Sequence, residues 1–303
     1  MLAEQPVAAA DLVAEATVVG LEVDALFERY LSDPGDGRSG LFAAMRHAGI
    51  GGGKRLRPLL TVATGRLFGL DQHRAMRAGA AIEAIHVYSL IHDDLPCMDD
   101  DDLRRGKPTV HKAFDEATAV LAGDCFHDLA FEILSDPATH EDPFVRAELV
   151  LELARASGPN GMAGGQMLDL AAQGQALDVV GITRLQQLKT GALIEYAVEA
   201  ACIMGRIPSE SRIPYRGYAR DLGLAFQIAD DLLDHCGDEA AAGKKLHKDA
   251  DAGKATFVSL LGEERARQQC EILVQQAIDH LHAHKEEADL LRSIAHYVRK
   301  RDR

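Results

Sequence analysis

Two runs of aspartate give this sequence of 303 residues its clearest potential for chemistry. Asp230, Asp231 and Asp234 follow the apolar segment LGLAFQIA, which suits a helix. Asp230 and Asp234 are four residues apart, so they share a helix face and repel each other unless a cation lies between them. No lysine or arginine stands within four positions of this run. Because oxygen ligands suit Mg²⁺, the run predicts a magnesium site.

The other run, DDLPCMDDDD, is less regular. Asp93 and Asp94 end an apolar stretch, and Pro96 disfavours helical geometry at the residue before it. We expect the helix to kink or end there, which would swing Asp99 back toward the metal that Asp93 binds. Residues 100–102 would be solvated or would cap the next segment. A single acidic run is usually a solvated surface, but two runs beneath apolar helices favour a shared metal site.

A basic segment, GGGKRLRPLL, supplies the opposite charge. Lys54, Arg55 and Arg57 lie between a glycine run and Pro58, which suits the first turn of a helix. Backbone N–H groups, cationic side chains and a helix N-terminus together form a site for an anion. The glycine and hydroxyl positions of a Walker A loop do not match, so a nucleotide-binding loop is not predicted.

Further basic residues follow the two aspartate runs. Arg104 and Arg105 could grip diphosphate oxygens or pair with the neighbouring aspartates. Lys244 and Lys254 lie in a glycine-containing segment that could fold over the site. The formal net charge of −14 disfavours nucleic acid as a partner. A diphosphate is anionic as well, so its binding to this acidic protein would need these cations together with Mg²⁺. Mg²⁺ typically bridges carboxylates to phosphates.

The composition predicts a folded protein without a membrane span. Hydrophobic residues make up 47% and charged residues 26%, and no long uncharged apolar run occurs. The acidic N-terminal stretch lacks the basic start and apolar core of a secretory signal. The five cysteines are scattered without CxxC spacing, which favours reduced thiols. We expect a cytoplasmic protein with no stable membrane insertion.

The apolar pattern indicates an all-α fold. Apolar residues recur at helical spacing in residues 10–30, 58–68, 74–95, 113–134, 143–157, 183–204, 214–234, 263–281 and 286–300. Short breakers separate these stretches, and no strand, repeat or long linker is evident. Residues 1–303 are therefore expected to form one helical domain. Residues 78–91 and 192–204 are apolar over much of their circumference, as in the inner helices of a bundle.

Six ordered motifs resemble short-chain trans-prenyl diphosphate synthases of the bacterial farnesyl diphosphate synthase type. They are GGKRLRP, SLIHDDLPCMDDDDLRRGKPT, GMAGGQMLDL, LKTGALI, LGLAFQIADDLLD and KDADAGKATF. The resemblance runs from about Gly51 to Arg303. It implies an isoprenoid synthase bundle, usually a homodimer, with the two aspartate motifs facing each other across a deep central cavity. It also implies three Mg²⁺ ions that bind an allylic diphosphate.

The resemblance assigns roles by motif position. Asp93, Asp99 and Asp230 correspond to direct metal ligands, with Asp94, Asp231 and Asp234 supporting them or coordinating through water. The residues that correspond to the isopentenyl diphosphate site are Gly53, Lys54, Arg57, His86 and Arg105. Those that correspond to contacts with the allylic diphosphate are Arg104, Lys189, Lys244 and Lys254. Lys189, Thr190 and Gln227 correspond to positions whose dipoles stabilise a carbocation near the reacting carbons.

The implied reaction is a head-to-tail condensation. The allylic C–O bond ionises, the double bond of isopentenyl diphosphate attacks the cation, and the released diphosphate accepts the proton. The growing tail would pass Tyr88 and Ser89, one turn before Asp93. An aromatic residue at this position implies farnesyl diphosphate as the main product. Geranyl or geranylgeranyl diphosphate is the alternative.

Three other interpretations are weaker. A terpene cyclase would not need the isopentenyl diphosphate contacts at Lys54, Arg57 and Arg105. A non-catalytic partner subunit of a prenyl synthase would be expected to have lost an aspartate motif, and both motifs are intact. An acidic helical binding protein would leave the ordered basic motifs unexplained.

Overall fold

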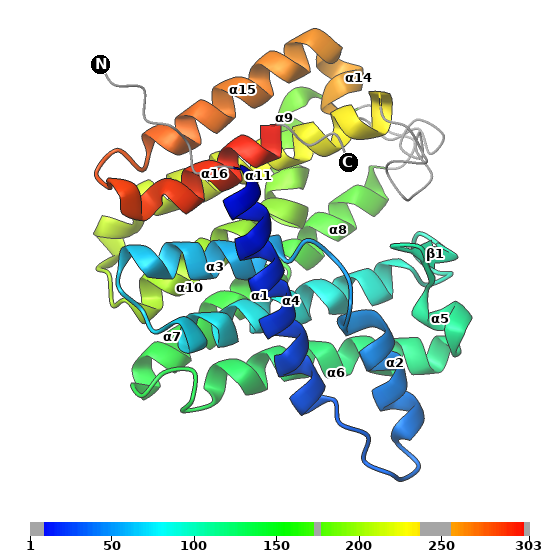
Figure 1. Cartoon of the computed structure of the whole chain (residues 1–303). Helices are drawn as coiled ribbons and strands as arrows, with labels where there is room; N and C mark the ends of the chain where they lie inside the picture. Colours follow the sequence, from blue (N-terminus) through cyan, green and yellow to red (C-terminus); the bar gives the residue numbers. More distant parts are fainter. Residues whose placement is uncertain (1–8, 173–176, 237–255, 300–303) are drawn as a thin grey trace.

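Helices carry almost all of the chain that the computed structural model describes, which is residues 9–172, 177–236 and 256–299 (Figure 1). The longer helices are α1 (Ala9–Tyr30), α2 (Ser39–Gly49), α3 (Leu56–Leu67), α4 (Gln72–Asp93), α6 (Glu116–Ser135), α7 (Pro143–Ser157), α8 (Met162–Ala171), α9 (Val179–Gln186), α10 (Ala192–Met204), α11 (Ile213–Cys236), α15 (Glu263–Asp279) and α16 (Asp289–Arg299). The shorter elements are β1 (Leu103–Arg104), β2 (Lys107–Pro108), α5 (Val110–Ala113), α14 (Phe257–Leu261), the π-helix η1 (Gln187–Gly191) and the 3₁₀-helices η2 (Ser209–Arg212) and η3 (Glu286–Ala288).

Two inner helices form the centre of the bundle. Helix α4 is buried without interruption from Ala78 to Ile85, and α10 is buried from Tyr196 to Met204. Small residues let neighbouring helices approach: a Cβ on Gly79 of α4 would lie 2.9 Å from the Cα of Pro58 in α3. The all-round apolar character predicted for these two helices is therefore observed, because each has packed neighbours on every side.

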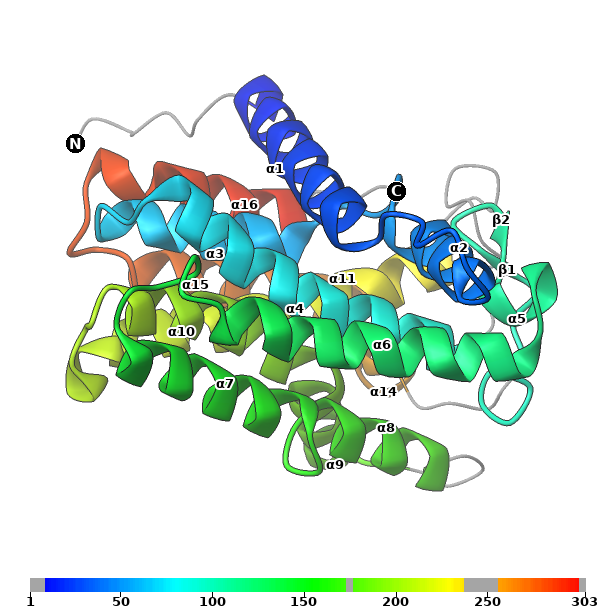
Figure 2. The same cartoon turned by 90° about the horizontal axis from the view of Figure 1, so that it is seen from below.

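Side-chain caps set where the helices begin. The carboxylate of Asp71 accepts from the N–H of Arg74 at the start of α4, and Asp115 accepts from Thr118 at the start of α6. These bonds satisfy N–H groups that have no partner inside the helix. The caps fix where α4 begins its run toward the site and where α6 begins beside the hairpin end of the bundle (Figure 2).

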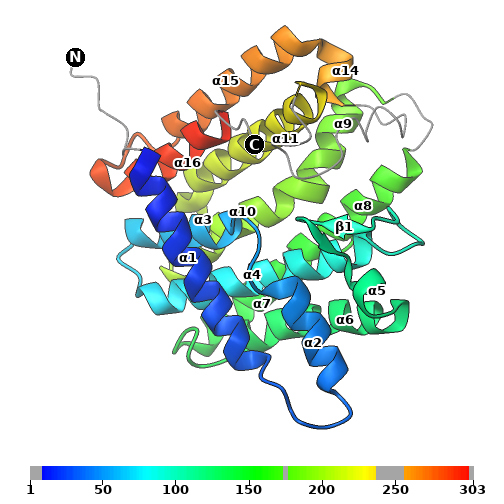
Figure 3. The same ribbon diagram turned by 45° about the vertical axis from the view of Figure 1, so that its right-hand side comes forward.

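One end of the bundle gathers the segments that carry the sequence motifs. The C-terminal ends of α4 and α11, the β1–β2 hairpin, α8 and α9 all lie at this end (Figures 1 and 3). Helices α6 and α7 form an outer layer on one face, and α1 and α16 lie on the opposite face (Figure 2). Among the described residues, no helix is long and apolar enough to cross a membrane.

The all-α prediction is confirmed, and helices occur in all nine predicted stretches. The expectation of no strand was wrong for Leu103–Arg104 and Lys107–Pro108, which pair in a short antiparallel hairpin. Helices α2 and α8 were not predicted. Three glycines in the GMAGGQ segment weaken its helical propensity, so α8 depends on tertiary packing that the local pattern does not show.

Candidate active site

The first aspartate motif forms the C-terminus of α4 and the turn that follows it. The helix ends at Asp93, as Pro96 predicted, and the N–H of Asp99 donates back to the carbonyl of Asp93 at 2.9 Å. The charge on Asp99 is one cause of the raised pKa of Asp93, which places the two carboxyl groups near each other. The turn therefore brings together two carboxyl groups that a continuous helix would separate.

The carboxyl group of Asp93 is difficult to ionise in the unliganded protein. Burial raises its pKa to about 6, with the neighbouring charges of Asp99 and Asp94 acting in the same direction. The charge of Lys189 in η1 acts in the opposite direction, so its ammonium group lies within electrostatic reach of Asp93. An added divalent cation would stabilise this carboxylate, so its environment fits a metal ligand.

Asp94 has a different environment. Only 3% of it is exposed, and it accepts from Nε of Arg104 at 3.0 Å and from Nη2 of the same guanidinium. Burial raises the pKa of Asp94, while these bonds lower it in part. The hairpin that carries Arg104 is thereby tied to the end of α4. In this state Asp94 fits a supporting role better than direct coordination.

The second motif lies at the C-terminal part of α11, and its three carboxylates differ. Asp231 is buried, and its two oxygens accept from Nε2 of Gln227 at 2.9 Å and from the N–H of Phe257 at 2.8 Å. It thus ties α11 to α14. Asp230 and Asp234 are half-buried. Burial lowers the pKa of Arg57, and the charge of Asp230 is one of the influences that oppose this, so the second aspartate motif lies within electrostatic reach of the basic segment.

A π-helix presents two of the predicted residues. Thr190 in η1 donates to Oε1 of Gln227 at 3.3 Å, and Nζ of Lys189 lies 2.6 Å from Oδ2 of Asp169 in α8. Gly165 is required at the contact, because a Cβ there would lie 2.2 Å from the backbone nitrogen of Lys189. Single π turns inside α-helices are frequent at functional sites. Lys189, Thr190, Gln227, Asp169 and Asp231 line a common cavity of 130 Å³.

The basic segment and the hairpin converge beneath the end of α4. A Cβ on Gly53 would lie 2.6 Å from the guanidinium of Arg105, so only glycine allows this approach. His86 is half-buried, and its pKa is well below the usual value because of burial and the charges of Arg57 and Arg105. Nε of Arg57 is buried without a hydrogen-bond partner among the described residues. These residues form a cationic cluster with unused donor capacity, which fits an anion.

The donor set fits Mg²⁺ that shares its ligands with a substrate. No group of three or more histidine, cysteine, aspartate or glutamate side chains in the described ranges could hold a metal unaided. Mg²⁺ seldom uses an all-protein cage and usually takes one or two carboxylates together with phosphate oxygens and water. Carboxylates on α4 and α11 that lie close to a cationic cluster match that requirement.

Comparison with known proteins identifies the family. A profile of the family described as polyprenyl synthetase matches residues 39–297. The chain belongs to the polyprenyl synthetase family. It is 44% identical to the farnesyl diphosphate synthase of Escherichia coli over 264 residues, which are 86% of this chain and 88% of that protein.

Solved structures agree with this assignment. An FPP/GFPP synthase from Zymomonas mobilis superposes with a TM-score of 0.88 at 57% identity, over 96% of this chain and 99% of that one. A geranyltransferase from Helicobacter pylori, complexed with magnesium and isoprenyl diphosphate, gives a TM-score of 0.78 at 32% identity, over 94% and 96% of the two chains. The predicted isoprenoid synthase fold and the predicted class of enzyme, a prenyl transferase, are thereby confirmed.

Other predicted residues of this polyprenyl synthetase make contacts of a different kind or lie outside the described part of the chain. Lys54 lies over the ring of Tyr297 at 5.9 Å, and Ser89 donates to the carbonyl of His86 at 2.9 Å. Lys244 and Lys254 lie outside the described residues. Arg55, which the sequence groups with Lys54 and Arg57 in one anion site, turns away from them into a buried ion pair with Glu83.

Tyr88, predicted to limit product length, packs in an aromatic cluster. Its ring meets His92 edge-on at 5.1 Å and His127 at 5.4 Å, and His127 in turn packs on Phe131 at 5.0 Å. The sequence analysis did not single out His127. Its position on α6 carries no motif, and its link to Tyr88 depends on how α4 and α6 pack.

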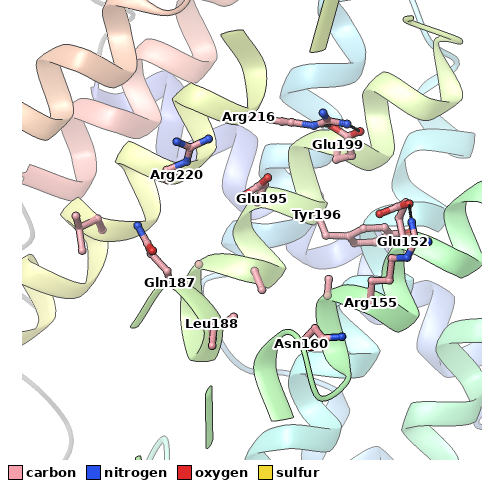
Figure 4. Close-up of a pocket in the computed structure, with 14 residues that line it drawn as sticks. Glu152, Arg155, Asn160, Gln187, Leu188, Glu195, Tyr196, Glu199, Arg216 and Arg220 are labelled. Atoms are coloured by element: carbon pink, nitrogen blue, oxygen red, sulfur yellow. Dashed lines mark hydrogen bonds and ion pairs between the residues drawn. The ribbon is translucent and has the colours of Figure 1, made fainter. Parts of the chain in front are cut away.

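A larger cavity of this polyprenyl synthetase lies elsewhere (Figure 4). It has a volume of 600 Å³ between α7, η1, α10 and α11, and none of the predicted site residues lines it. Most of its charged side chains pair with each other, as Arg155 does with Glu152 and Arg216 with Glu199 (Figure 4). Its size therefore does not make it the candidate site, because the groups suited to diphosphate and metal do not line it.

Proposed function

We propose that this polyprenyl synthetase condenses isopentenyl diphosphate with dimethylallyl and geranyl diphosphates and that farnesyl diphosphate is its main product. One observation carries the proposal. The buried carboxyl group of Asp93, with a pKa of about 6, lies within electrostatic reach of Lys189, while Arg57 and Arg105 form a cationic cluster within electrostatic reach of Asp230. A metal-assisted site for one diphosphate therefore lies beside a separate cationic site for a second.

Mg²⁺ is the proposed cofactor, with three ions per site when substrate is bound. Asp93, Asp99 and Asp230 would be the direct ligands, and the magnesium in the Helicobacter pylori relative supports this class of ion. Bound Mg²⁺ would neutralise charge on the allylic diphosphate and so favour its departure. Asp94, Asp231 and Asp234 complete the proposed metal site. The hydrogen bonds of Asp94 and Asp231 favour supporting roles for these two.

The two substrates would be held by different segments. Isopentenyl diphosphate would contact Gly53, Lys54, Arg57, His86 and Arg105. The allylic diphosphate would contact Arg104, Lys189, Lys244 and Lys254. The neutral His86 can donate one N–H to a phosphate oxygen while the arginines supply the charge. To bind the allylic diphosphate, Arg104 would have to give up its hydrogen bonds to Asp94 or divide its donors between Asp94 and the substrate.

The part of the protein in the chemistry would be to hold and orient the two substrates and to shield the cation from water. As the allylic C–O bond breaks, Lys189 would hold the leaving diphosphate, and the oxygens of Thr190 and Gln227 would face the positive carbon. The double bond of isopentenyl diphosphate then forms the new C–C bond. The proton lost from the adjacent carbon goes to the released diphosphate. Exclusion of water protects the cation from hydrolysis.

Product length would be set by Tyr88, with Ser89 beside it on the same turn of α4. The packing of Tyr88 against His127 supports this, because a ring held from two sides can block a growing tail. Geranyl and geranylgeranyl diphosphate remain alternative products. The Zymomonas mobilis relative is an FPP/GFPP synthase, so products longer than farnesyl diphosphate must be included in any assay.

A homodimer is proposed through the outer layer of α6 and α7 (Figure 2). Leu121, Phe144 and Leu151 are 53%, 82% and 48% exposed there, more than is usual for large apolar side chains. Sedimentation equilibrium should give twice the chain mass. A monomer at micromolar concentration would overturn the assignment.

The deciding experiment is incubation of the purified protein with Mg²⁺, isopentenyl diphosphate and each allylic diphosphate in turn. Products are dephosphorylated and sized by chromatography. Condensation that stops at fifteen carbons would support the proposal, and addition of EDTA should abolish it. If no pair condenses, the enzyme assignment fails. A different main product would replace farnesyl diphosphate without changing the reaction class.

A further inference from the structure

The loop that leads into α3 adopts a backbone conformation that must be held in place. Arg55, at the N-cap of α3, has a φ of 47°, in the left-handed region that side chains other than glycine rarely adopt. Gly51 and Gly53 also have positive φ, at 73° and 84°. A non-glycine residue stays in this region only where surrounding contacts fix it. The loop therefore needs an anchor.

The side chain of Arg55 is that anchor. It is 2% exposed, and its Nη1 donates to Oε1 of Glu83 on α4 at 2.8 Å. Its Nη2 donates to Oδ1 of Asp24 on α1 at 2.6 Å and to the carbonyl of Gly49 at 2.5 Å. The guanidinium also lies over the ring of Phe27 at 5.9 Å. The fork of an arginine can join these three acceptors at once, whereas the single ammonium of a lysine cannot match their directions.

Asp24 extends the anchor to a second point of the loop. Its other oxygen, Oδ2, accepts from the backbone N–H of Gly51 at 3.0 Å. One buried side chain and one carboxylate thus tie the loop at Gly49, Gly51 and Arg55 to helices on either side of it. Two carboxylates surround the single guanidinium, so the buried charge of Arg55 is fully paired and the group as a whole carries one net negative charge.

The anchored loop also carries residues of the proposed isopentenyl diphosphate site. Gly53 packs against the guanidinium of Arg105, and Arg57 lies close enough to His86 to lower its pKa. Glu83, which binds Arg55 directly, also acts on Arg57 through its charge. Movement of the anchor would therefore move Gly53 and Arg57 relative to Arg105, whose own position is set by the hairpin.

We infer that Arg55, Glu83 and Asp24 form a positioning network that sets the affinity for the non-allylic substrate, isopentenyl diphosphate. The inference rests on the proposed function and deepens it. None of the three residues is among those proposed to contact a diphosphate, so we place their action in the loop that they hold. The described allylic contacts, Arg104 and Lys189, are held by Asp94 and Asp169 instead. A loosened loop should therefore weaken the binding of isopentenyl diphosphate and leave the binding of the allylic diphosphate almost unchanged.

The test compares Arg55→Gln, Arg55→Lys and Asp24→Asn with a matched control. Arg77→Gln is that control, because Arg77 is also an arginine with several partners: it joins α4 to Asp136, Tyr30 and Thr139, away from the loop. For each variant we would measure KM for both substrates, kcat, Tm, and the Kd for isopentenyl diphosphate by calorimetry. The calorimetric value does not depend on turnover.

We expect Arg55→Gln to raise both KM and Kd for isopentenyl diphosphate about tenfold, since small misplacements of binding groups have effects of this size or larger. Arg55→Lys should recover part of the loss, and Asp24→Asn should show a smaller increase. The KM of the allylic substrate should change less than twofold in all three. Arg77→Gln should lower Tm and leave both KM values near those of the wild type.

The inference is wrong if folded Arg55→Gln or Asp24→Asn protein keeps the wild-type affinity for isopentenyl diphosphate, or if both KM values rise together. If Arg55→Gln does not fold, Asp24→Asn decides. If the wild type binds isopentenyl diphosphate but condenses nothing, the proposed function fails while the Kd values still test the network. If the wild type does not bind it at all, both fail.

Discussion

Gly53 lies against the guanidinium of Arg105 so closely that a Cβ on residue 53 would be 2.6 Å from three of its atoms. The two residues come from different motifs, one from the loop before α3 and one from the turn between β1 and β2. Their contact is where the basic segment and the first aspartate motif meet. It joins the two parts of the proposed isopentenyl diphosphate site.

Gly53→Ala should therefore displace Arg105 as well as strain the loop. The φ of 84° alone costs an alanine about 1 kcal/mol of stability, and the contact adds a shift of the guanidinium. We expect KM for isopentenyl diphosphate to rise about tenfold or more, as for other misplaced binding groups. Steady-state kinetics with each substrate varied in turn would measure it.

Gly69→Ala is the matched control for this variant. Gly69 has a φ of 64°, and a Cβ there would meet nothing within 4 Å. The control should lose a similar amount of stability without a change in KM. Equal KM values in Gly53→Ala and wild-type protein would show that Arg105 can move aside without consequence.

Asp93 should make metal binding depend on pH. Its pKa of about 6 in the unliganded protein means that Mg²⁺ must displace a proton below pH 6 but not above pH 7. We expect the Mg²⁺ concentration for half-maximal activity to rise up to about tenfold per pH unit below 6 and to level off above 7. Activity titrations with Mg²⁺ between pH 5.5 and 8 would show this. A flat response would mean that Asp93 does not bind the ion.

The same shift gives a prediction for stability. The folded protein holds a proton on Asp93 at a pH where the unfolded chain, with a pKa of 3.8, has released it. This carboxyl therefore favours the folded state below pH 4, and that contribution is lost as pH rises through 6. Asp93→Asn should raise the free energy of unfolding at pH 7.5 by about 1–2 kcal/mol, after allowance for its partial exposure, while activity falls at least about a hundredfold. Urea unfolding would measure the gain, which should vanish at pH 4.

The long inner helices could be predicted because their apolar residues recur at helical spacing and because the sequence also marks where they end. Helix α4 ends where Pro96 requires it, and α11 carries Asp230 and Asp234 on one face. The family motifs also mark the pieces that meet in the site. These features depend on the local sequence, so they can be predicted without the structure.

Other features depend on contacts that no local pattern contains. The stretch 183–204 reads as one helix, but five residues in it form a π turn that aims Lys189 and Thr190. Arg55 has the same charge as Lys54 and Arg57, and a left-handed backbone together with Glu83 turns it inward. Packing between distant helices decides both outcomes.

The two adjacent aspartates of α11 should respond differently to amidation. Asp231 accepts from Gln227 and from the N–H of Phe257, so Asp231→Asn breaks one of these bonds and should lower stability by about 1–3 kcal/mol. Its effect on the Mg²⁺ requirement should be small. Asp230→Asn should instead raise that requirement at least about tenfold, because it removes a proposed ligand. Equal Mg²⁺ dependence of the two variants would contradict this division of roles.

Product length provides the last prediction, because Tyr88 is held in place by side chains of two helices. Tyr88→Ala would remove the ring that meets His92 and His127, and the tail could then grow past this point. We expect products longer than fifteen carbons, with total turnover changed by less than about tenfold, since the ring lies outside the reacting groups. His127→Ala should shift the products in the same direction but less, because the ring of Tyr88 would remain without its support from α6. Tyr88→Phe keeps both ring contacts and should leave product length unchanged, which separates the size of the ring from its hydroxyl. An unchanged product distribution in Tyr88→Ala would remove Tyr88 from this role and leave the length limit to another part of the tail's path.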